Sequence, residues 1–109
     1  MRKFVETIKM EYNIIISIEA EKDTNDAYCY YEDQQPGLGE RFLNELSHFY
    51  NKLKQHPKYY SFTSENKTNR SVALKIFPYK IVYEIEDEKL YVFAVYHFRQ
   101  NPDNLFKRL

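Results

Sequence analysis

Residues 71–99 read SVALKIFPYKIVYEIEDEKLYVFAVYHFR, and this pattern predicts three consecutive β-strands. The first strand, residues 71–77, places every second side chain on one apolar face: Val72, Leu74 and Ile76. We expect this face to pack on a core. Pro78 then interrupts the strand, because proline has no amide hydrogen to donate and fixes its own φ.

The second strand, residues 80–86, alternates in the same way and directs its apolar residues inward: Ile81, Tyr83 and Ile85. The polar residues 86–89 supply a hairpin turn before the third strand, residues 90–98. That strand is apolar at nearly every position, which is typical of a strand covered on both faces. It is therefore predicted to lie inside the sheet, and its far end carries His97 and Arg99.

Upstream of this segment, the pattern predicts one more strand and a first helix. Residues 12–18 alternate as a strand rich in β-branched residues, with one face formed by Tyr12, Ile14, Ile16 and Ile18. From Glu19 the apolar period becomes helical, and the stripe consists of Ala20, Thr24, Ala27, Tyr28 and Tyr31. Residues 34–37, QQPG, end that helix, because proline disfavours a helical residue before it and glycine permits a reversal.

A second helix begins near Leu38 and ends at His56 and Pro57. Its apolar stripe recurs every three or four residues: Leu38, Phe42, Leu46, Phe49 and Leu53. A short connection between two amphipathic helices favours an antiparallel hairpin that covers one side of a sheet. Residues 58–70 are predicted to be an irregular connection with an exposed polar tip.

The predicted order is therefore β-α-α-β-β-β, an α+β fold. In this fold the helical hairpin packs on one face of a small, mainly antiparallel four-stranded sheet. We expect residues 12–18 to pair in parallel with the last strand, which would explain why that strand is so apolar. A chain of 109 residues with this composition is long enough for one core and one domain.

Composition excludes several classes of protein. Sixteen basic and sixteen acidic residues give zero formal charge, which argues against binding nucleic acid mainly through phosphates. The lone Cys29 and the lack of a signal-like run predict a cytoplasmic location, and no apolar run is long enough to span a membrane. The histidines lack the short spacing and cysteine partners of a metal site, so we expect no metal and no cofactor.

Three sequence segments, taken together with this element order, are similar to those of a known family. They are YYEDQQPGLGERF at residues 30–42, FPYKIVY at residues 77–83 and VYHFRQNP at residues 95–102. Together with the order β-α-α-β-β-β they resemble the RelE/ParE toxin superfamily, most closely its ParE-like, plasmid-stabilisation branch. The resemblance begins at Met10. It therefore divides the chain into a toxin domain, residues 10–109, and an N-terminal extension or mis-called start, residues 1–9.

The resemblance implies the toxin component of a type II toxin-antitoxin system, neutralised by a cognate antitoxin protein. Two mechanisms are implied by different branches. ParE-like members poison DNA gyrase, whereas RelE-like members are ribosome-dependent endonucleases that cleave messenger RNA. A third alternative is an inert relative that only binds antitoxin. Whether the free protein forms a homodimer stays open.

For a nuclease, His97 is the candidate general acid or base and Arg99 the candidate for stabilising charge on the phosphate. Counting by twos along the strand places His97 on one face with Tyr91, Phe93, Val95 and Arg99. In some nuclease members a histidine-tyrosine pair follows the last strand. His97 matches that histidine, but Phe98 replaces the tyrosine, and this departure favours the binding toxin over the nuclease.

Four basic residues are the candidate binding residues for phosphate or for an acidic antitoxin: Arg70, Lys75, Lys80 and Arg99. We expect the antitoxin to lie along the sheet and to cross near the last three of them. The zero net charge again favours a toxin that binds and inhibits its target, because a ribosome-bound nuclease is expected to carry a marked cationic face.

Overall fold

The computed structural model describes residues 11–63 and 67–100. Its elements are β1 (Asn13–Ile16), α1 (Ile18–Gln34), α2 (Leu38–Gln55), a short 3-10 helix (Pro57–Tyr59), β2 (Asn69–Ala73), β3 (Tyr79–Glu86) and β4 (Lys89–His97). The element order matches the predicted β-α-α-β-β-β. The predicted extension, residues 1–9, lies outside the described residues.

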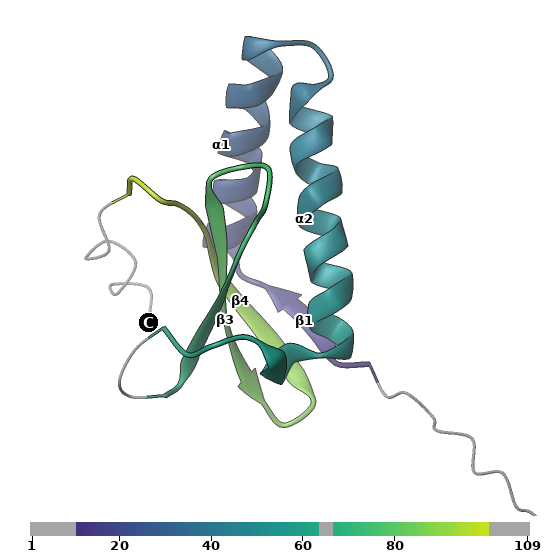
Figure 1. The fold of residues 1–109 in the computed structure, drawn as a ribbon, viewed down its shortest axis with the longest axis vertical. Coiled ribbons are helices and arrows are strands. Elements are labelled where there is room, and N and C mark those ends of the chain that lie inside the picture. Colours follow the sequence, from purple (N-terminus) through teal and green to yellow (C-terminus); the bar gives the residue numbers. More distant parts are fainter. Residues whose placement is uncertain (1–10, 64–66, 101–109) are drawn as a thin grey trace, which may run out of the picture.

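The four strands form one sheet in the order β1-β4-β3-β2. The central strand β4 pairs in parallel with β1 and antiparallel with β3, and β3 pairs antiparallel with β2. Figure 1 shows α1 and α2 as a hairpin beside this sheet. The predicted α+β fold, the interior position of the last strand and its parallel pairing with the first are all confirmed.

The core lies between the helical hairpin and the sheet. The predicted stripe of α2 supplies Phe42, Leu46, Phe49 and Leu53, which are all buried. Against them pack the sheet residues Val72, Ile81, Tyr83, Leu90, Val92 and Val95. Burying a side chain of this size contributes about 1.5–3 kcal/mol, so this layer provides most of the stabilisation of the fold.

The junction between β1 and α1 differs from its prediction. The strand ends at Ile16, and Ser17 caps the helix by accepting a hydrogen bond from the Ala20 amide at 3.0 Å. Ile18 is therefore the first residue of α1 and is 81% exposed, not part of a strand face. The predicted strand 12–18 was too long because the serine cap overrides the apolar alternation.

The turn between α1 and α2, which contains the PGLG segment, is held by a carboxylate of α1. The Glu32 carboxylate accepts hydrogen bonds from the Gly37 and Gly39 amides at 3.0 Å and thereby caps the start of α2. Gly37 has a φ of 89°, which favours glycine. A Cβ on Gly39 would lie 2.7 Å from the carbonyl oxygen of Tyr28, so only glycine lets the two helices approach.

The strand predicted for residues 71–77 ends early. β2 stops at Ala73, and the chain then curls around the carboxylate of Glu45 from α2. Because the alternation stops there, Ile76 is 67% exposed instead of facing the core, and Phe77 is buried. In Figure 1 the connection from β2 to β3 rises beside the helices.

A β-bulge in β4 changes the face on which His97 was predicted to lie. Phe93 is an extra residue in β4, because the pairing with β3 shifts register at this point. Such a bulge reverses the face that later side chains occupy. Val95, beyond the bulge, lies in the same core as Val92, before it. The prediction that His97 shares a face with Tyr91 and Phe93 is therefore wrong. His97 does share a face with Val95, as predicted, and this face is on the side of the helices.

Candidate functional site

His97 is the last residue of β4, and its polar atoms are held by the turn that follows. The imidazole Nδ1 accepts a hydrogen bond from the Arg99 amide at 3.0 Å, and the His97 amide donates to the Gln100 side chain at 2.7 Å. A neutral imidazole that accepts through Nδ1 carries its proton on Nε2. In this arrangement Nε2–H can donate a hydrogen bond, whereas the basic nitrogen, Nδ1, is already occupied.

The His97 pocket, as we call it, has a volume of about 550 Å³ and is lined by Tyr30, Tyr31, Pro78, Tyr79, His97, Phe98 and Arg99. It lies between α1 and the end of the sheet where β3 begins and β4 ends. The structure thus brings together the two predicted catalytic residues, His97 and Arg99, and surrounds them with aromatic rings. Arg99 and Phe98 are exposed at its edge.

An aromatic cluster supports this pocket from the core. The ring of His97 meets Tyr79 edge to face at 4.9 Å, and Tyr79 meets Phe42 at 5.1 Å. Tyr31 contacts Phe77 at 4.7 Å. Burial, with a smaller contribution from Tyr31, raises the pKa of Tyr79 to about 12. Tyr79 therefore stays neutral at physiological pH and acts as packing, not as a base.

Arg70, a predicted binding residue, is already engaged within the protein. Its guanidinium donates to the carbonyl oxygens of Lys58 at 3.2 Å and of Tyr60 at 2.6 Å. It also stacks on the ring of Phe62, 3.9 Å from the ring centroid. These contacts fasten the segment after the 3-10 helix to the edge strand β2, so that Arg70 has a structural role in addition to any contact with a partner.

The other two predicted binding residues, Lys75 and Lys80, lie in different places. Lys80 follows the buried Tyr79 on β3 and is exposed on the opposite face of the sheet, with its Nζ 5.6 Å from the Phe98 ring centroid. Lys75 lies in the β2–β3 loop beside α2. The structure therefore does not gather the predicted cations into one surface on the sheet.

A feature that the sequence analysis missed lies where that loop meets α2. The Glu45 carboxylate accepts hydrogen bonds from the amides of Lys75, Ile76 and Phe77 at 2.8–3.1 Å, although Glu45 is only 8% exposed. The sequence carried a signal: a carboxylate interrupts the apolar stripe of α2 between Phe42 and Leu46. A charge on a buried stripe indicates a dedicated partner.

The groove beside this clamp, which we call the loop groove, has a volume of about 490 Å³. Its lining comes from α2 and the β2–β3 loop: Arg41, Asn44, Glu45, His48, Phe49, Lys75 and Ile76. Apart from Lys75, none of these residues was a sequence-based candidate. They line one groove because α2 contacts a loop about 30 residues further along the chain. The periodicity of the sequence does not reveal such a contact.

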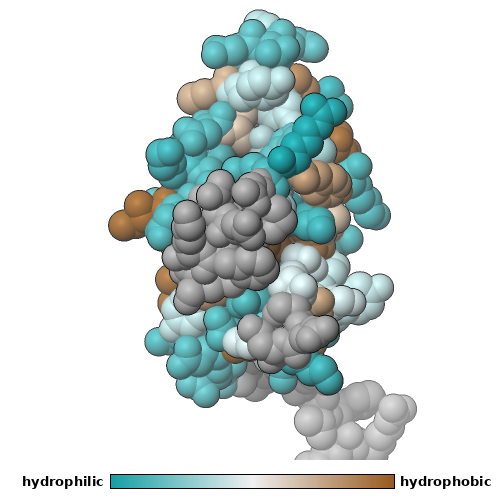
Figure 2. All heavy atoms as spheres, turned by 90° about the vertical axis from the view of Figure 1, so that its left-hand side faces the viewer, coloured by the Kyte–Doolittle hydropathy of each residue, from teal (hydrophilic) through white to brown (hydrophobic). Residues whose placement is uncertain are grey.

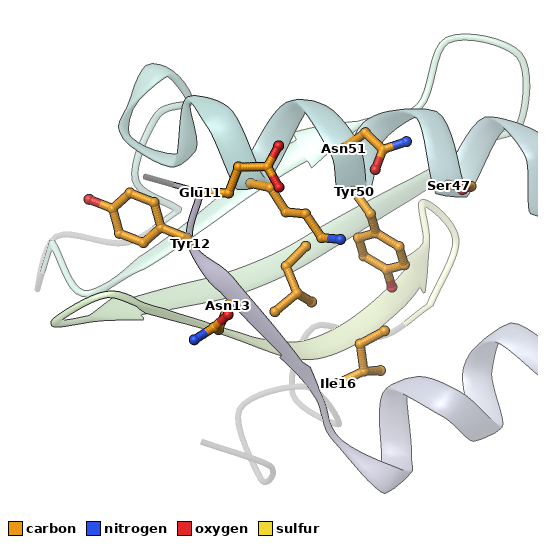
Figure 3. Close-up of a pocket in the computed structure, with 9 residues that line it drawn as sticks. Glu11, Tyr12, Asn13, Ile16, Ser47, Tyr50 and Asn51 are labelled. Carbon is orange, nitrogen blue, oxygen red and sulfur yellow. The ribbon is translucent and has the colours of Figure 1, made fainter. Parts of the chain in front are cut away.

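A further pocket of about 470 Å³ lies between the edge strand β1 and α2. Figure 3 shows Tyr50 and Asn51 of α2 above β1, with the Tyr50 ring directed toward Ile16. The Tyr50 hydroxyl is buried without a hydrogen-bond partner among the described residues. Burial raises the pKa of Tyr50. Among the described residues that line this pocket, the charged ones are Glu11 and Lys54.

Within residues 11–63 and 67–100 there is no group of histidine, cysteine, aspartate or glutamate side chains that could hold a metal ion. No helix in the same part of the chain is long and apolar enough to cross a membrane. The face in Figure 2 is mainly hydrophilic, and its apolar residues occur as separate spots outside the grey atoms. Isolated apolar side chains of this kind are normal on a protein surface.

Two solved structures share this fold. The first belongs to the chromosomal ParDE toxin-antitoxin system of Pseudomonas aeruginosa, with a TM-score of 0.70 at 13% identity, and covers 81% of this chain and 97% of that chain. The second belongs to the toxin-antitoxin complex RelBE2 of Mycobacterium tuberculosis, with a TM-score of 0.56 at 18% identity, and covers 80% of this chain and 98% of that chain.

No curated protein sequence matches this chain. A family model does match, over residues 14–102, and it describes the ParE toxin of the type II toxin-antitoxin system parDE. The match spans both helices and all of β2, β3 and β4, and it agrees with the resemblance seen in the sequence. The chain therefore belongs to the ParE toxin family of type II toxin-antitoxin systems.

Proposed function

We propose that this protein is a toxin that binds and inhibits a macromolecular target such as DNA gyrase, and that a cognate antitoxin neutralises it. Family membership supports the toxin part of the proposal. The two similar structures come from a ParDE system and a RelBE2 complex, which supports an antitoxin partner. The choice of gyrase follows from the ParE-like branch that the sequence resembles.

The geometry of His97 carries the choice of binding over cleavage. A nuclease must remove a proton from the 2′-hydroxyl, and the nitrogen of His97 that could accept it already accepts the Arg99 amide. Of the cations that would hold phosphate, Lys80 lies on the opposite face of the sheet and Arg70 binds two carbonyl oxygens of its own chain. These positions do not form one phosphate-binding reaction centre with His97, which supports binding over cleavage.

Controlled expression in a bacterial host, followed by a supercoiling assay with purified gyrase, tests the proposal. Induction should arrest growth and induce DNA repair, and the purified chain should inhibit supercoiling. Co-expression of the small acidic protein encoded in the neighbouring reading frame should restore growth. Growth arrest without any effect on supercoiling would rule out gyrase as the target. Arrest that no neighbouring protein relieves would contradict the antitoxin.

A ribosome-dependent ribonuclease is the second candidate, and one observation favours it. His97 and Arg99 share a pocket with four aromatic rings on which an unstacked base could lie. Under this alternative the Arg99 amide releases Nδ1, the imidazolium of His97 donates a proton through Nε2 to the leaving 5′-oxygen, a base supplied by the ribosome takes the 2′-hydroxyl proton, and Arg99 stabilises the phosphate charge. His97→Ala and Arg99→Ala would then each lower the cleavage rate by about a hundredfold or more without unfolding the protein.

A well-folded chain that neither arrests growth nor cleaves transcripts, yet binds the acidic neighbour, would be the inert relative. Circular dichroism of the purified protein separates this outcome from misfolding. The three outcomes differ in the state of DNA, of messenger RNA and of the complex, so the same induced culture distinguishes them.

A further inference from the structure

We propose that the loop groove is the docking site for an acidic amphipathic helix of the antitoxin. This inference rests on the proposed function in one respect, since it takes the partner to be the antitoxin. Three features of the groove support docking: a fixed loop, an exposed apolar side chain and basic side chains along the rim.

The loop is fixed before any partner arrives. Three successive amides, from Lys75 to Phe77, donate to one carboxylate, and Glu45 holds that carboxylate from the middle of α2. Phe77, buried against Phe42 at 5.3 Å, anchors the same loop to the core. A loop held by charge-assisted hydrogen bonds loses little conformational entropy when a partner binds.

This fixed loop presents an apolar side chain to solvent. Ile76 is 67% exposed, between two residues whose amides are tied to Glu45. It lines the groove together with Phe49, whose buried ring forms the apolar base. Apolar side chains that remain exposed in a rigid groove are the usual anchors for an amphipathic helix.

The rim of the groove is cationic. Arg41 on α2 and Lys75 on the loop supply its positive charges, the polar His48 lies two turns after Arg41, and all three side chains are exposed. Lys52 continues the row along α2, with its Nζ 5.4 Å from the Phe49 ring centroid. The carboxylate that lines the groove, Glu45, is buried and engaged by the loop amides. The formal charge of the whole chain is zero, but the exposed charged side chains that line this groove, Arg41 and Lys75, are both basic.

An apolar base with a cationic rim matches an acidic segment that carries apolar side chains. A nucleic acid would satisfy the cations but leave Ile76 and Phe49 without apolar contact, and a basic segment would be repelled. The row from Arg41 to Lys52 extends for about 16 Å along α2, enough to contact three turns of a helix. Such a helix can set leucine side chains on the base and carboxylates against the rim.

The first experiment uses a designed peptide, so that it does not depend on the antitoxin. A helical peptide with leucine on one face and glutamate on the other is titrated into ¹⁵N-labelled protein. Amide shifts should concentrate at Arg41, His48 and residues 75–77. A peptide with lysine in place of glutamate should cause none of them. If the acidic peptide shifts no amide of the groove, or only amides of another surface, the docking proposal is overturned.

The second experiment measures the affinity of the antitoxin encoded in the neighbouring reading frame. Ile76→Ser, and separately the pair Arg41→Glu with Lys75→Glu, should each weaken binding by at least about tenfold. The matched controls are Ile18→Ser, at an isoleucine that is 81% exposed elsewhere, and the pair Lys22→Glu with Lys89→Glu, which changes net charge equally. Both controls should leave the affinity unchanged.

The outcomes separate the docking site from the proposed function. If the wild-type chain binds the antitoxin and the groove variants bind equally well, the antitoxin docks elsewhere and this inference fails alone. Variants that keep their affinity for the antitoxin but no longer arrest growth would assign the groove to the target, which also overturns it. If the wild-type chain binds no neighbouring protein, the proposed function fails, and the peptide titration still decides the groove. Thermal unfolding confirms that each variant is folded.

Discussion

The β2–β3 loop lines both sites, the loop groove with Lys75 and Ile76 and the His97 pocket with Pro78, yet the two sites are built in opposite ways. In the loop groove, a buried carboxylate fixes the backbone and leaves apolar and cationic side chains exposed. In the His97 pocket, aromatic side chains and a tight turn fix the histidine. The first arrangement suits recognition, and the second restrains the group that chemistry would need.

The difference shows that a titratable residue at a strand end is weak support for catalysis until its hydrogen bonds are known. His97 has the residue type and the position of a catalyst, but the turn uses its basic nitrogen. Glu45 has neither, yet it determines the shape of the surface that we propose binds the partner.

Phe77→Ala should have the largest effect, because Phe77 belongs to the clamped loop and also contacts Tyr31 of the His97 pocket. Truncating a buried phenylalanine costs about 3–5 kcal/mol, measured as the loss in free energy of unfolding in urea. Phe98→Ala is the control at a ring that is 49% exposed, and it should cost less than about 1 kcal/mol. Equal losses would mean that Phe77 does not link the two regions.

Glu45→Ala should break the loop groove and spare the His97 pocket. Three amides lose their acceptor, so we expect a loss of about 2–4 kcal/mol in the free energy of unfolding. Glu45→Gln keeps one acceptor oxygen and should lose less. Glu40→Ala, at an exposed carboxylate in the same helix, should change stability by less than about 0.5 kcal/mol. Shifts of the His97 imidazole resonances in Glu45→Ala would contradict the separation of the two regions.

Two of the predicted binding cations should respond differently to truncation. Arg70→Ala removes two hydrogen bonds to carbonyl oxygens and the stack on Phe62, and should destabilise the fold by about 1–2 kcal/mol. Lys75→Ala leaves its backbone contact with Glu45 in place and should change stability by less than about 0.5 kcal/mol. Thermal unfolding of both variants decides whether Arg70 is structural as described.

The smallest expected effect is the loss of stability at alkaline pH that comes from Tyr79 in the aromatic cluster. Burial raises the pKa of Tyr79 to about 12, above about 10 for tyrosine in an unfolded chain. The stability that this group contributes is fully present below pH 10 and is lost as the pH rises from about 10 to 12. Tyr79→Phe should lose less stability over that range. A variant whose stability falls as steeply as that of the wild type would show that other buried tyrosines, such as Tyr83, dominate.

Much of the fold follows from the sequence, because local signals and burial agree over most of the chain. The stripe from Phe42 to Leu53 predicted α2, and the apolar run after Lys89 predicted an interior strand. The errors occur where one side chain redirects the backbone. Ser17 ends β1, and Glu45 ends β2, by bonds to amides that the apolar pattern does not encode.

The candidate site was less predictable, because it depends on contacts between distant segments. The sequence placed His97 and Arg99 correctly at the end of the last strand. It gave the wrong face for His97, since a single extra residue at Phe93 reverses the alternation. The loop groove could not be assembled from the pattern, because Glu45 and Ile76 meet only in the folded chain.

Primer extension across transcripts after induction of the wild type and of His97→Ala tests the central claim most directly, because cleavage and binding leave different products. We expect both proteins to arrest growth and to leave messenger RNA intact, with inhibited supercoiling in each case. Cuts at defined codon positions that the wild type makes and His97→Ala does not would contradict the account and establish the ribonuclease.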